Sequence, residues 1–167
     1  MASQRNALPE RNLTSAAFKA LGFLLLGGIG AAYAAEAPDN VAAEIADAVQ
    51  SCKNQDGTAN GDAALSVNDV NGDGGEDWIV DYAKFICKGG INEMCGDDGC
   101  TLRIYLWNGD AAWNLAFDET VKSYKFAKHG GRHVLQVVTA GSACDKPSNE
   151  TCHLTYRLNK NSIDLWR

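Results

Sequence analysis

Apolar positions in the second half of the chain recur at every second residue, the period of a β-strand that buries one face. Residues 101–107 alternate Leu102, Ile104 and Leu106 with their neighbours. After an Asn-Gly-Asp turn the chain returns with Trp113, Leu115 and Phe117 expected on one face. The alternation continues through four later stretches: 120–127, 133–140, 152–158 and 162–166. Together these stretches predict antiparallel strands that are joined by hairpins.

The part of the chain before these strands follows a helical period first. In residues 41–52 the apolar side chains recur on one helical face, and Asp39 or Asn40 stands ahead of them as a potential N-cap. Residues 53–63 are loop by composition, and residues 77–87 predict a strongly apolar strand. We therefore expect an α+β fold, in which one N-terminal helix packs on an antiparallel, meander-like sheet of about six or seven strands. A sandwich or small barrel without helical cover is the alternative.

The N-terminus carries a targeting pattern. Three basic residues precede the uncharged stretch 20–35, which contains the small-residue pattern Ala-Tyr-Ala at 32–34. This order predicts that residues 1–34 are a cleaved secretory signal peptide and that residues 35–167 form a single domain. The apolar stretch is shorter than the roughly 20 residues that span a bilayer, so we expect no stable membrane anchor after cleavage.

The cysteines agree with an exported address. They lie at six positions downstream of the predicted signal: Cys52, Cys87, Cys95, Cys100, Cys144 and Cys152. An even number in an exported chain indicates a disulfide framework. Cys95 and Cys100 flank an Asp/Gly turn, and Cys144 and Cys152 flank a Pro-containing loop. These two local pairs would leave Cys52 with Cys87, although six cysteines allow fifteen pairings. The sequence has no C-x2-C spacing, which argues against a zinc or thioredoxin-type site.

Charge and composition narrow the classes of function. The formal net charge is −6, and removal of the basic signal segment would make the domain more acidic. An acidic domain lacks the lysines and arginines that neutralise phosphates, so we expect no nucleic-acid partner. The four Trp and five Tyr mostly follow the strand period, which favours core positions over a carbohydrate- or peptide-binding surface.

One acidic loop has the composition of a metal site. Asp69, Asn71 and Asp73 place side-chain oxygens at positions 1, 3 and 5 of the loop, and Asp77 stands at position 9. A glycine occupies position 6, and Gly75 would offer its carbonyl at position 7. Ca²⁺ prefers six to eight oxygen ligands of these kinds, so the loop predicts a calcium site.

Residues 69–77 resemble the calcium loops of the EF-hand, dockerin and FG-GAP (integrin-like) families. An EF-hand continues with a bidentate Glu at position 12, where this chain has Val80, and a strand follows the loop instead of a helix. The FG-GAP type is therefore the closer comparison, and it implies a structural Ca²⁺ ion rather than a sensor. The alternative is a metal-free Asn-Gly-Asp-Gly turn, although carboxylates held this close repel one another without a cation.

No phosphate loop, dinucleotide fingerprint or G-x-S-x-G elbow is present in the sequence. The overall layout resembles small exported proteins of Gram-negative bacteria, a resemblance that implies no activity. We expect a non-enzymatic periplasmic or secreted domain with a structural calcium loop, which binds a protein or an envelope component as an inhibitor or accessory subunit. The alternatives are a metal-free structural or stress-related exported protein, and a hydrolase whose site is not visible in the sequence.

Overall fold

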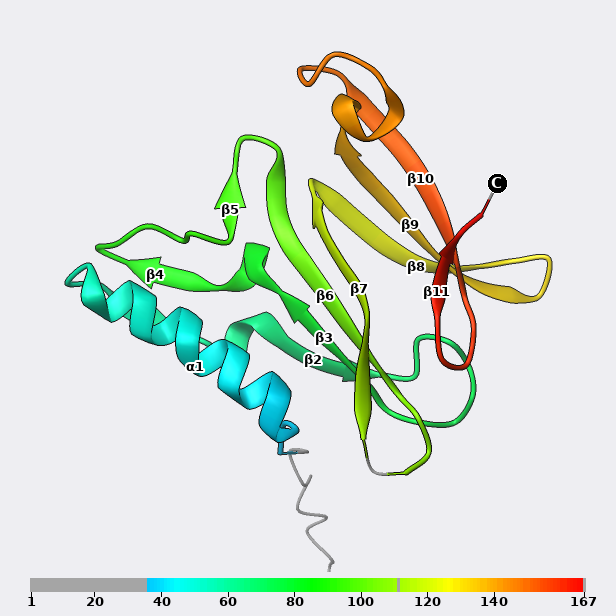
Figure 1. The fold of residues 1–167 in the computed structure, drawn as a ribbon, viewed down its shortest axis with the longest axis horizontal. Helices are drawn as coiled ribbons and strands as arrows, with labels where there is room; N and C mark the ends of the chain where they lie inside the picture. Colours follow the sequence, from blue (N-terminus) through cyan, green and yellow to red (C-terminus); the bar gives the residue numbers. More distant parts are fainter. Residues whose placement is uncertain (1–35, 111, 167) are drawn as a thin grey trace, which may run out of the picture. The chain divides into compact units, whose positions relative to one another are not determined.

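The computed structural model describes residues 36–110 and 112–166 (Figure 1), so the predicted signal peptide lies outside the described residues. The helical elements are α1 (Asp39–Asn54), η1 (Asp62–Ala64), η2 (Tyr82–Lys84) and η3 (Gly141–Cys144). The strands are β1 (Thr58–Asn60), β2 (Leu65–Asn68), β3 (Asp77–Asp81), β4 (Ile86–Lys88), β5 (Cys95–Gly96), β6 (Gly99–Trp107), β7 (Trp113–Val121), β8 (Ser123–His129), β9 (Arg132–Ala140), β10 (Thr151–Leu158) and β11 (Ile163–Leu165).

A central sheet is built from β2, β3, β5, β6 and β7. Strands β3 and β7 flank β6, because Ile104 of β6 pairs with Ile79 on one side and with Phe117 on the other. All five residues of β3 are buried, since both faces of the sheet are covered. Burial on both faces explains why this segment is a nearly continuous apolar run.

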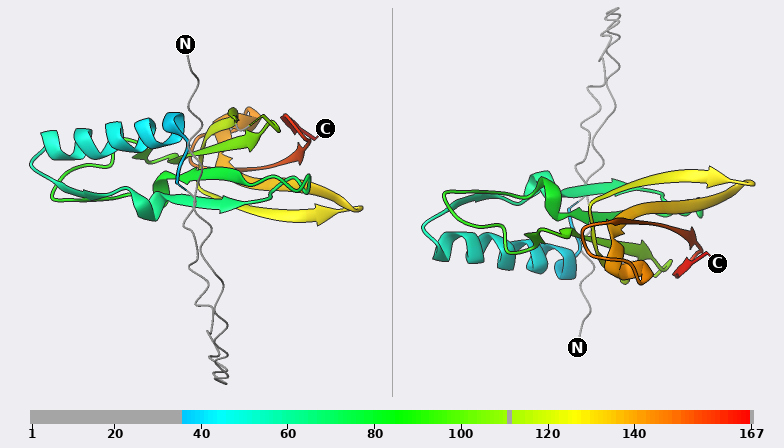
Figure 2. Two further views of the ribbon diagram at one scale, coloured as in Figure 1. Left: turned by 90° about the horizontal axis from the view of Figure 1, so that it is seen from below. Right: turned by 90° about the horizontal axis from the view of Figure 1, so that it is seen from above.

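The two faces of the central sheet bury different partners. Helix α1 covers one face, where Val41 and Ile45 pack with Trp78 and Val80. The other face packs against a second sheet, which we call the C-terminal sheet; its strand order is β11-β10-β9-β8. Figure 1 shows α1, the central sheet and the C-terminal sheet in that order from left to right, and Figure 2 places α1 and β8–β11 at opposite ends.

This arrangement confirms the α+β class with one helix packed on an antiparallel sheet. The described residues contain eleven strands in three sheets, which is more than the six or seven expected. One reason lies in residues 77–87, which were expected to form one strand. The Asp81 carboxylate accepts a hydrogen bond from Ala83 N at 3.1 Å, which starts η2 and separates β3 from β4.

Two local expectations were wrong. Helix α1 begins at Asp39 after Pro38, and no side chain caps its N-terminus, so neither Asp39 nor Asn40 acts as the N-cap. In the β6–β7 hairpin, the register shifts between Ile104 and Tyr105. This bulge places Leu115 and Phe117 on opposite faces, although simple alternation predicts one shared face.

Three disulfides join the elements. Cys52–Cys87 joins α1 to β4, and Cys95–Cys100 joins β5 to β6. Cys144–Cys152 joins η3 to β10. These are the pairs that the local spacing suggested. Three disulfides are compatible with an extracellular or periplasmic compartment, and no helix within residues 36–110 and 112–166 has the length and apolar character to cross a membrane.

Candidate functional site

The acidic loop connects β2 to β3, and its side chains fold back onto its own backbone. Asp69 Oδ1 accepts hydrogen bonds from Gly72 N at 2.7 Å and Asp73 N at 3.2 Å, and Asp69 Oδ2 accepts one from Gly74 N at 3.0 Å. Gly72 and Gly74 have φ values of 81° and 88°, which a side chain would disfavour. The Asn-Gly-Asp-Gly stretch therefore forms the tight turn that its composition predicts.

Asn71 and Asp73 continue this network. Asn71 Oδ1 accepts a hydrogen bond from Asp73 N at 2.9 Å, and Asp73 Oδ1 accepts one from Gly75 N at 2.8 Å. Gly75 is buried against the Trp107 ring, which a Cβ atom would meet at 2.0 Å. Gly75 thus has a packing role, whereas the sequence predicts only that its carbonyl oxygen is a calcium ligand.

Asp77 is the anchor of the loop. It is fully buried, and its two carboxylate oxygens accept hydrogen bonds from Val70 N at 3.0 Å and Trp107 N at 2.9 Å. Burial raises the pKa of Asp77 above its usual range, the two backbone hydrogen bonds oppose this shift, and the charges of Asp73 and Asp69 add to it. The carboxylate therefore ties the loop to the end of β6.

The donor chemistry of the loop fits a hard cation. Asp69, Asn71, Asp73 and Asp77 each carry a side-chain oxygen that can act as a metal ligand, and no basic side chain of the described residues forms an ion pair with the three carboxylates. Each carboxylate oxygen can accept a further interaction beyond its hydrogen bond. The structure nevertheless gathers no group of three His, Cys, Asp or Glu side chains at metal-binding distance among residues 36–110 and 112–166.

The acidic loop also contacts the C-terminal sheet. Asn71 Nδ2 donates hydrogen bonds to Asn159 O and Lys160 O, each at 3.3 Å, in the turn between β10 and β11. His133 Nδ1 on β9 lies 2.9 Å from Val70 O. The loop therefore links the central sheet to the sheet that follows it in the chain.

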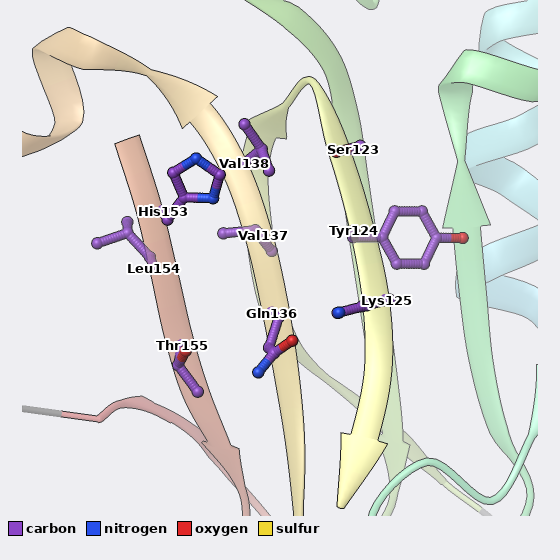
Figure 3. A pocket seen from close by; sticks show the side chains of 9 residues that line it. All are labelled: Ser123, Tyr124, Lys125, Gln136, Val137, Val138, His153, Leu154 and Thr155. Carbon is purple, nitrogen blue, oxygen red and sulfur yellow. The ribbon is translucent and has the colours of Figure 1, made fainter. Parts of the chain in front are cut away.

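A hollow of about 460 Å³ lies on the C-terminal sheet (Figure 3). Strand register brings six of its nine lining residues onto one face, in two rows across β8, β9 and β10: Ser123, Val138 and His153, then Lys125, Gln136 and Thr155. Figure 3 shows Tyr124 directed away from this group. The opposite face of the sheet carries Leu135 and Val137, which belong to the core. We call the face with the six residues the outer face.

Trp166 closes one end of the outer face. Its backbone N donates to Thr155 O at 2.7 Å. Its ring meets the His129 ring edge-on at 5.3 Å between centroids, and Arg157 Cζ lies over the ring at 5.4 Å. A second hollow of about 240 Å³ is lined by His129, Gln136, Thr155 and Trp166. Because Gln136 and Thr155 line both hollows, the two adjoin and are together called the depression.

The outer face is cationic in an acidic protein. Strands β8, β9 and β10 contain no Asp or Glu, and they carry all three histidines of the chain. Lys125, Arg132 and Arg157 lie on the outer face by register. Asp164 of β11 pairs with Arg157 in register and is the acid on this face. Within the described residues, ion pairs are made by Lys84 and Arg103 only, so Lys125, Arg132 and Arg157 form none, and positive charge is in excess on the outer face. Arg157 Nε is buried without a hydrogen-bond partner among those residues.

The sequence interpretation missed this face, although a signal was present. No acidic residue occurs between Glu119 and Asp145, a stretch that contains three lysines and an arginine. The apolar alternation within each strand indicates the face of the sheet that packs in the core. Only the register between strands shows that the polar positions of three strands align.

A second polar cluster that the sequence did not suggest joins α1 to the central sheet. Glu44 accepts hydrogen bonds from Tyr82 Oη at 2.6 Å and from Tyr105 Oη, and it pairs with Arg103 Nη1 at 2.8 Å. Arg103 Nε also pairs with Asp118 at 2.9 Å. Burial, followed by the Glu44 interaction, raises the pKa of both tyrosines, so they stay neutral donors. The cluster is satisfied internally, which indicates a structural role.

Comparisons with known proteins do not assign the chain to a family. No protein-family model matches it, and neither the curated proteins nor the solved structures contain a match. The chemistry of the outer face and of the acidic loop therefore carries the functional argument.

Proposed function

We propose that this chain is an exported, non-enzymatic binding domain of the periplasm or the secreted fraction, and that its outer face binds an anionic carbohydrate of the cell envelope. The observation that carries the proposal is the excess of positive charge on the outer face, where Lys125, Arg132 and Arg157 outnumber Asp164, in a chain of net charge −6. Charge of one sign in a hollow attracts ligands of the opposite sign. An anionic ligand therefore matches this face better than a neutral or cationic one.

The uncharged side chains favour a carbohydrate among anionic ligands. Ser123 and Thr155 offer hydroxyl groups and Gln136 offers an amide, which together can donate to and accept from sugar hydroxyls. Lys125 and His153 stand beside them and would pair with a carboxylate or phosphate group. Trp166 provides an apolar surface at the end of the depression. This mixture of groups suits a short run of acidic sugars.

The same face supports binding rather than catalysis. Within the described residues, His133 is the histidine whose ring makes a hydrogen bond, and its partner is the backbone carbonyl of Val70 rather than a nucleophilic side chain. Ser123 and His153 are separated by Val138 in the register. A nucleophile and its base normally lie within hydrogen-bond reach, and no such pair supports the hydrolase alternative.

Binding of trigalacturonate, measured by calorimetry, tests the proposal. We expect binding that weakens strongly when NaCl rises from about 50 mM to about 500 mM, because salt screens exposed charges. Maltotriose, a neutral sugar of the same length, should bind at least about tenfold more weakly. A triglutamate peptide is the second control: equal binding of the peptide would point to an acidic protein partner and contradict the carbohydrate assignment.

Reversing one charge on the outer face should weaken this binding. We expect Lys125→Glu to raise the Kd for trigalacturonate by at least about tenfold, since an attractive contact becomes a repulsive one. Lys128→Glu is the matched control, because Lys128 is exposed on the other face of the same strand. An equal loss in both variants would show that net charge, rather than this face, controls binding.

We also propose that the acidic loop binds a structural Ca²⁺ ion. Oxygen donors from Asp69, Asn71 and Asp73, with no basic partner in the described residues, support this proposal, and bound Ca²⁺ would supply a counter-charge for the loop. Because Asn71 and Val70 contact the C-terminal sheet, a stabilised loop would also stabilise the sheet that carries the outer face. Asp77 already accepts two backbone hydrogen bonds and would support the loop from within.

Calcium should therefore raise the melting temperature. At a free Ca²⁺ concentration about tenfold above the Kd, mass action predicts about 1.4 kcal/mol of stabilisation, which corresponds to a few degrees for a domain of this size. Asp73→Asn should abolish the shift while it keeps an acceptor for Gly75 N. Asp97→Asn, in another Asp/Gly turn, is the control and should leave the shift unchanged. Identical melting curves in Ca²⁺ and in chelator would rule out the metal.

A further inference from the structure

A separate groove of about 760 Å³ lies between the N-terminal half of α1 and β2. Its floor is apolar and includes Leu65, Val67 and the almost fully buried Trp78. Its rim carries the exposed carboxylates of Glu36, Asp39 and Asp62. None of the three forms an ion pair within the described residues. The groove is therefore apolar at its base and negative at its edge.

The groove borders a free strand edge. Strand β2 pairs with β3 from Leu65 to Asn68, and no other strand of the described residues pairs with it. Figure 1 shows β2 at the margin of the central sheet on the side of α1. An edge strand presents unpaired backbone N–H and C=O groups, which a second extended chain can use.

We propose that this groove binds an extended peptide segment of a partner protein, in which lysine or arginine alternates with apolar residues, as an added strand beside β2. Side chains of an extended peptide alternate in direction. The apolar residues would face Leu65, Val67 and Trp78, and the long basic side chains would extend past the edge of the added strand to the carboxylates at the rim. Three carboxylates supply the negative charge that matches the basic residues of the peptide. One of them, Asp39, also offsets the partial positive charge at the start of α1.

A blocked hexapeptide of alternating Lys and Val, labelled for fluorescence anisotropy, is the probe. We expect it to bind, and we expect the corresponding Glu and Val peptide to bind at least about tenfold more weakly. A Lys-Val peptide that is N-methylated at alternate residues should bind more weakly than the unmodified peptide by a similar factor, because it cannot complete the strand hydrogen bonds. Equal binding of the anionic peptide would overturn the charge argument, and equal binding of the N-methylated peptide would overturn strand addition.

Substitutions locate the site on the protein. Asp39→Asn combined with Asp62→Asn should weaken binding of the Lys-Val peptide by about tenfold, since two exposed ion pairs with the peptide would be lost. Asp62→Asn alone, which leaves α1 untouched, should account for part of this loss. Asp47→Asn on the exposed side of α1 and Lys125→Glu on the outer face should leave peptide binding unchanged. An equal loss with Asp47→Asn, or no loss with the double variant, would contradict the proposal.

Discussion

Replacement of Glu44 by alanine is expected to lower the free energy of unfolding by about 3 kcal/mol. The Glu44 side chain is 12% exposed and serves three partners, Tyr82, Tyr105 and Arg103. Removing one member of a buried ion pair typically costs about 3–5 kcal/mol, because the remaining charge stays buried. We take the lower end, since Arg103 keeps its pairing with Asp118.

Urea denaturation of the Glu44→Ala and Glu44→Gln variants measures this effect. Glutamine keeps an acceptor oxygen for one tyrosine, so Glu44→Gln should lower the free energy of unfolding by less, about 1–2 kcal/mol. Asp47→Ala, on the exposed side of the same helix, should change stability by less than about 0.5 kcal/mol. A Glu44→Ala variant as stable as the parent protein would show that the cluster does not hold α1 on the central sheet.

Replacement of Asp77 by alanine is expected to lower the free energy of unfolding by about 2–4 kcal/mol, and to do so equally in Ca²⁺ and in chelator. Asp77 is fully buried, and its loss leaves the N–H groups of Val70 and Trp107 without acceptors. An unsatisfied buried donor costs about 1–3 kcal/mol. The effect does not depend on the metal, because both hydrogen bonds are made by the protein alone.

Denaturation of Asp77→Ala with and without chelator separates the two roles of the acidic loop. Glu76→Ala, at the exposed neighbouring position, is the control and should be nearly neutral. If the cost of Asp77→Ala disappeared in chelator, the carboxylate would act through a bound ion instead of through the backbone hydrogen bonds.

The later strands of this fold were predictable because the alternation of apolar and polar residues within each strand shows which of its faces is buried. The alternation in residues 133–140 indicated that Leu135 and Val137 share a face, and both are in the core. The same holds for the disulfides, since Cys95–Cys100 and Cys144–Cys152 are separated by only 5 and 8 residues. A short separation favours such pairs, although it does not exclude the other pairings that six cysteines allow.

The remaining features depend on contacts between distant residues. Glu44 meets Tyr82 and Tyr105 across 38 and 61 positions, and no local pattern links them. The outer face requires the register of three strands, and Trp166 reaches it only because β11 pairs with β10. The acidic loop lies between these cases: its turn was visible in the sequence, whereas the buried anchoring role of Asp77 and the contacts with His133 and Asn159 were not.

The central claim is that the outer face of the C-terminal sheet binds an anionic carbohydrate, and an NMR titration with trigalacturonate tests it most directly. We predict that the largest chemical-shift changes fall on the Trp166 indole and on five residues of the outer face: Ser123, Lys125, Gln136, His153 and Thr155. At the same concentration, maltotriose should shift these signals much less. Changes confined to other elements, or equal changes with maltotriose, would contradict the assignment of this face as the binding site.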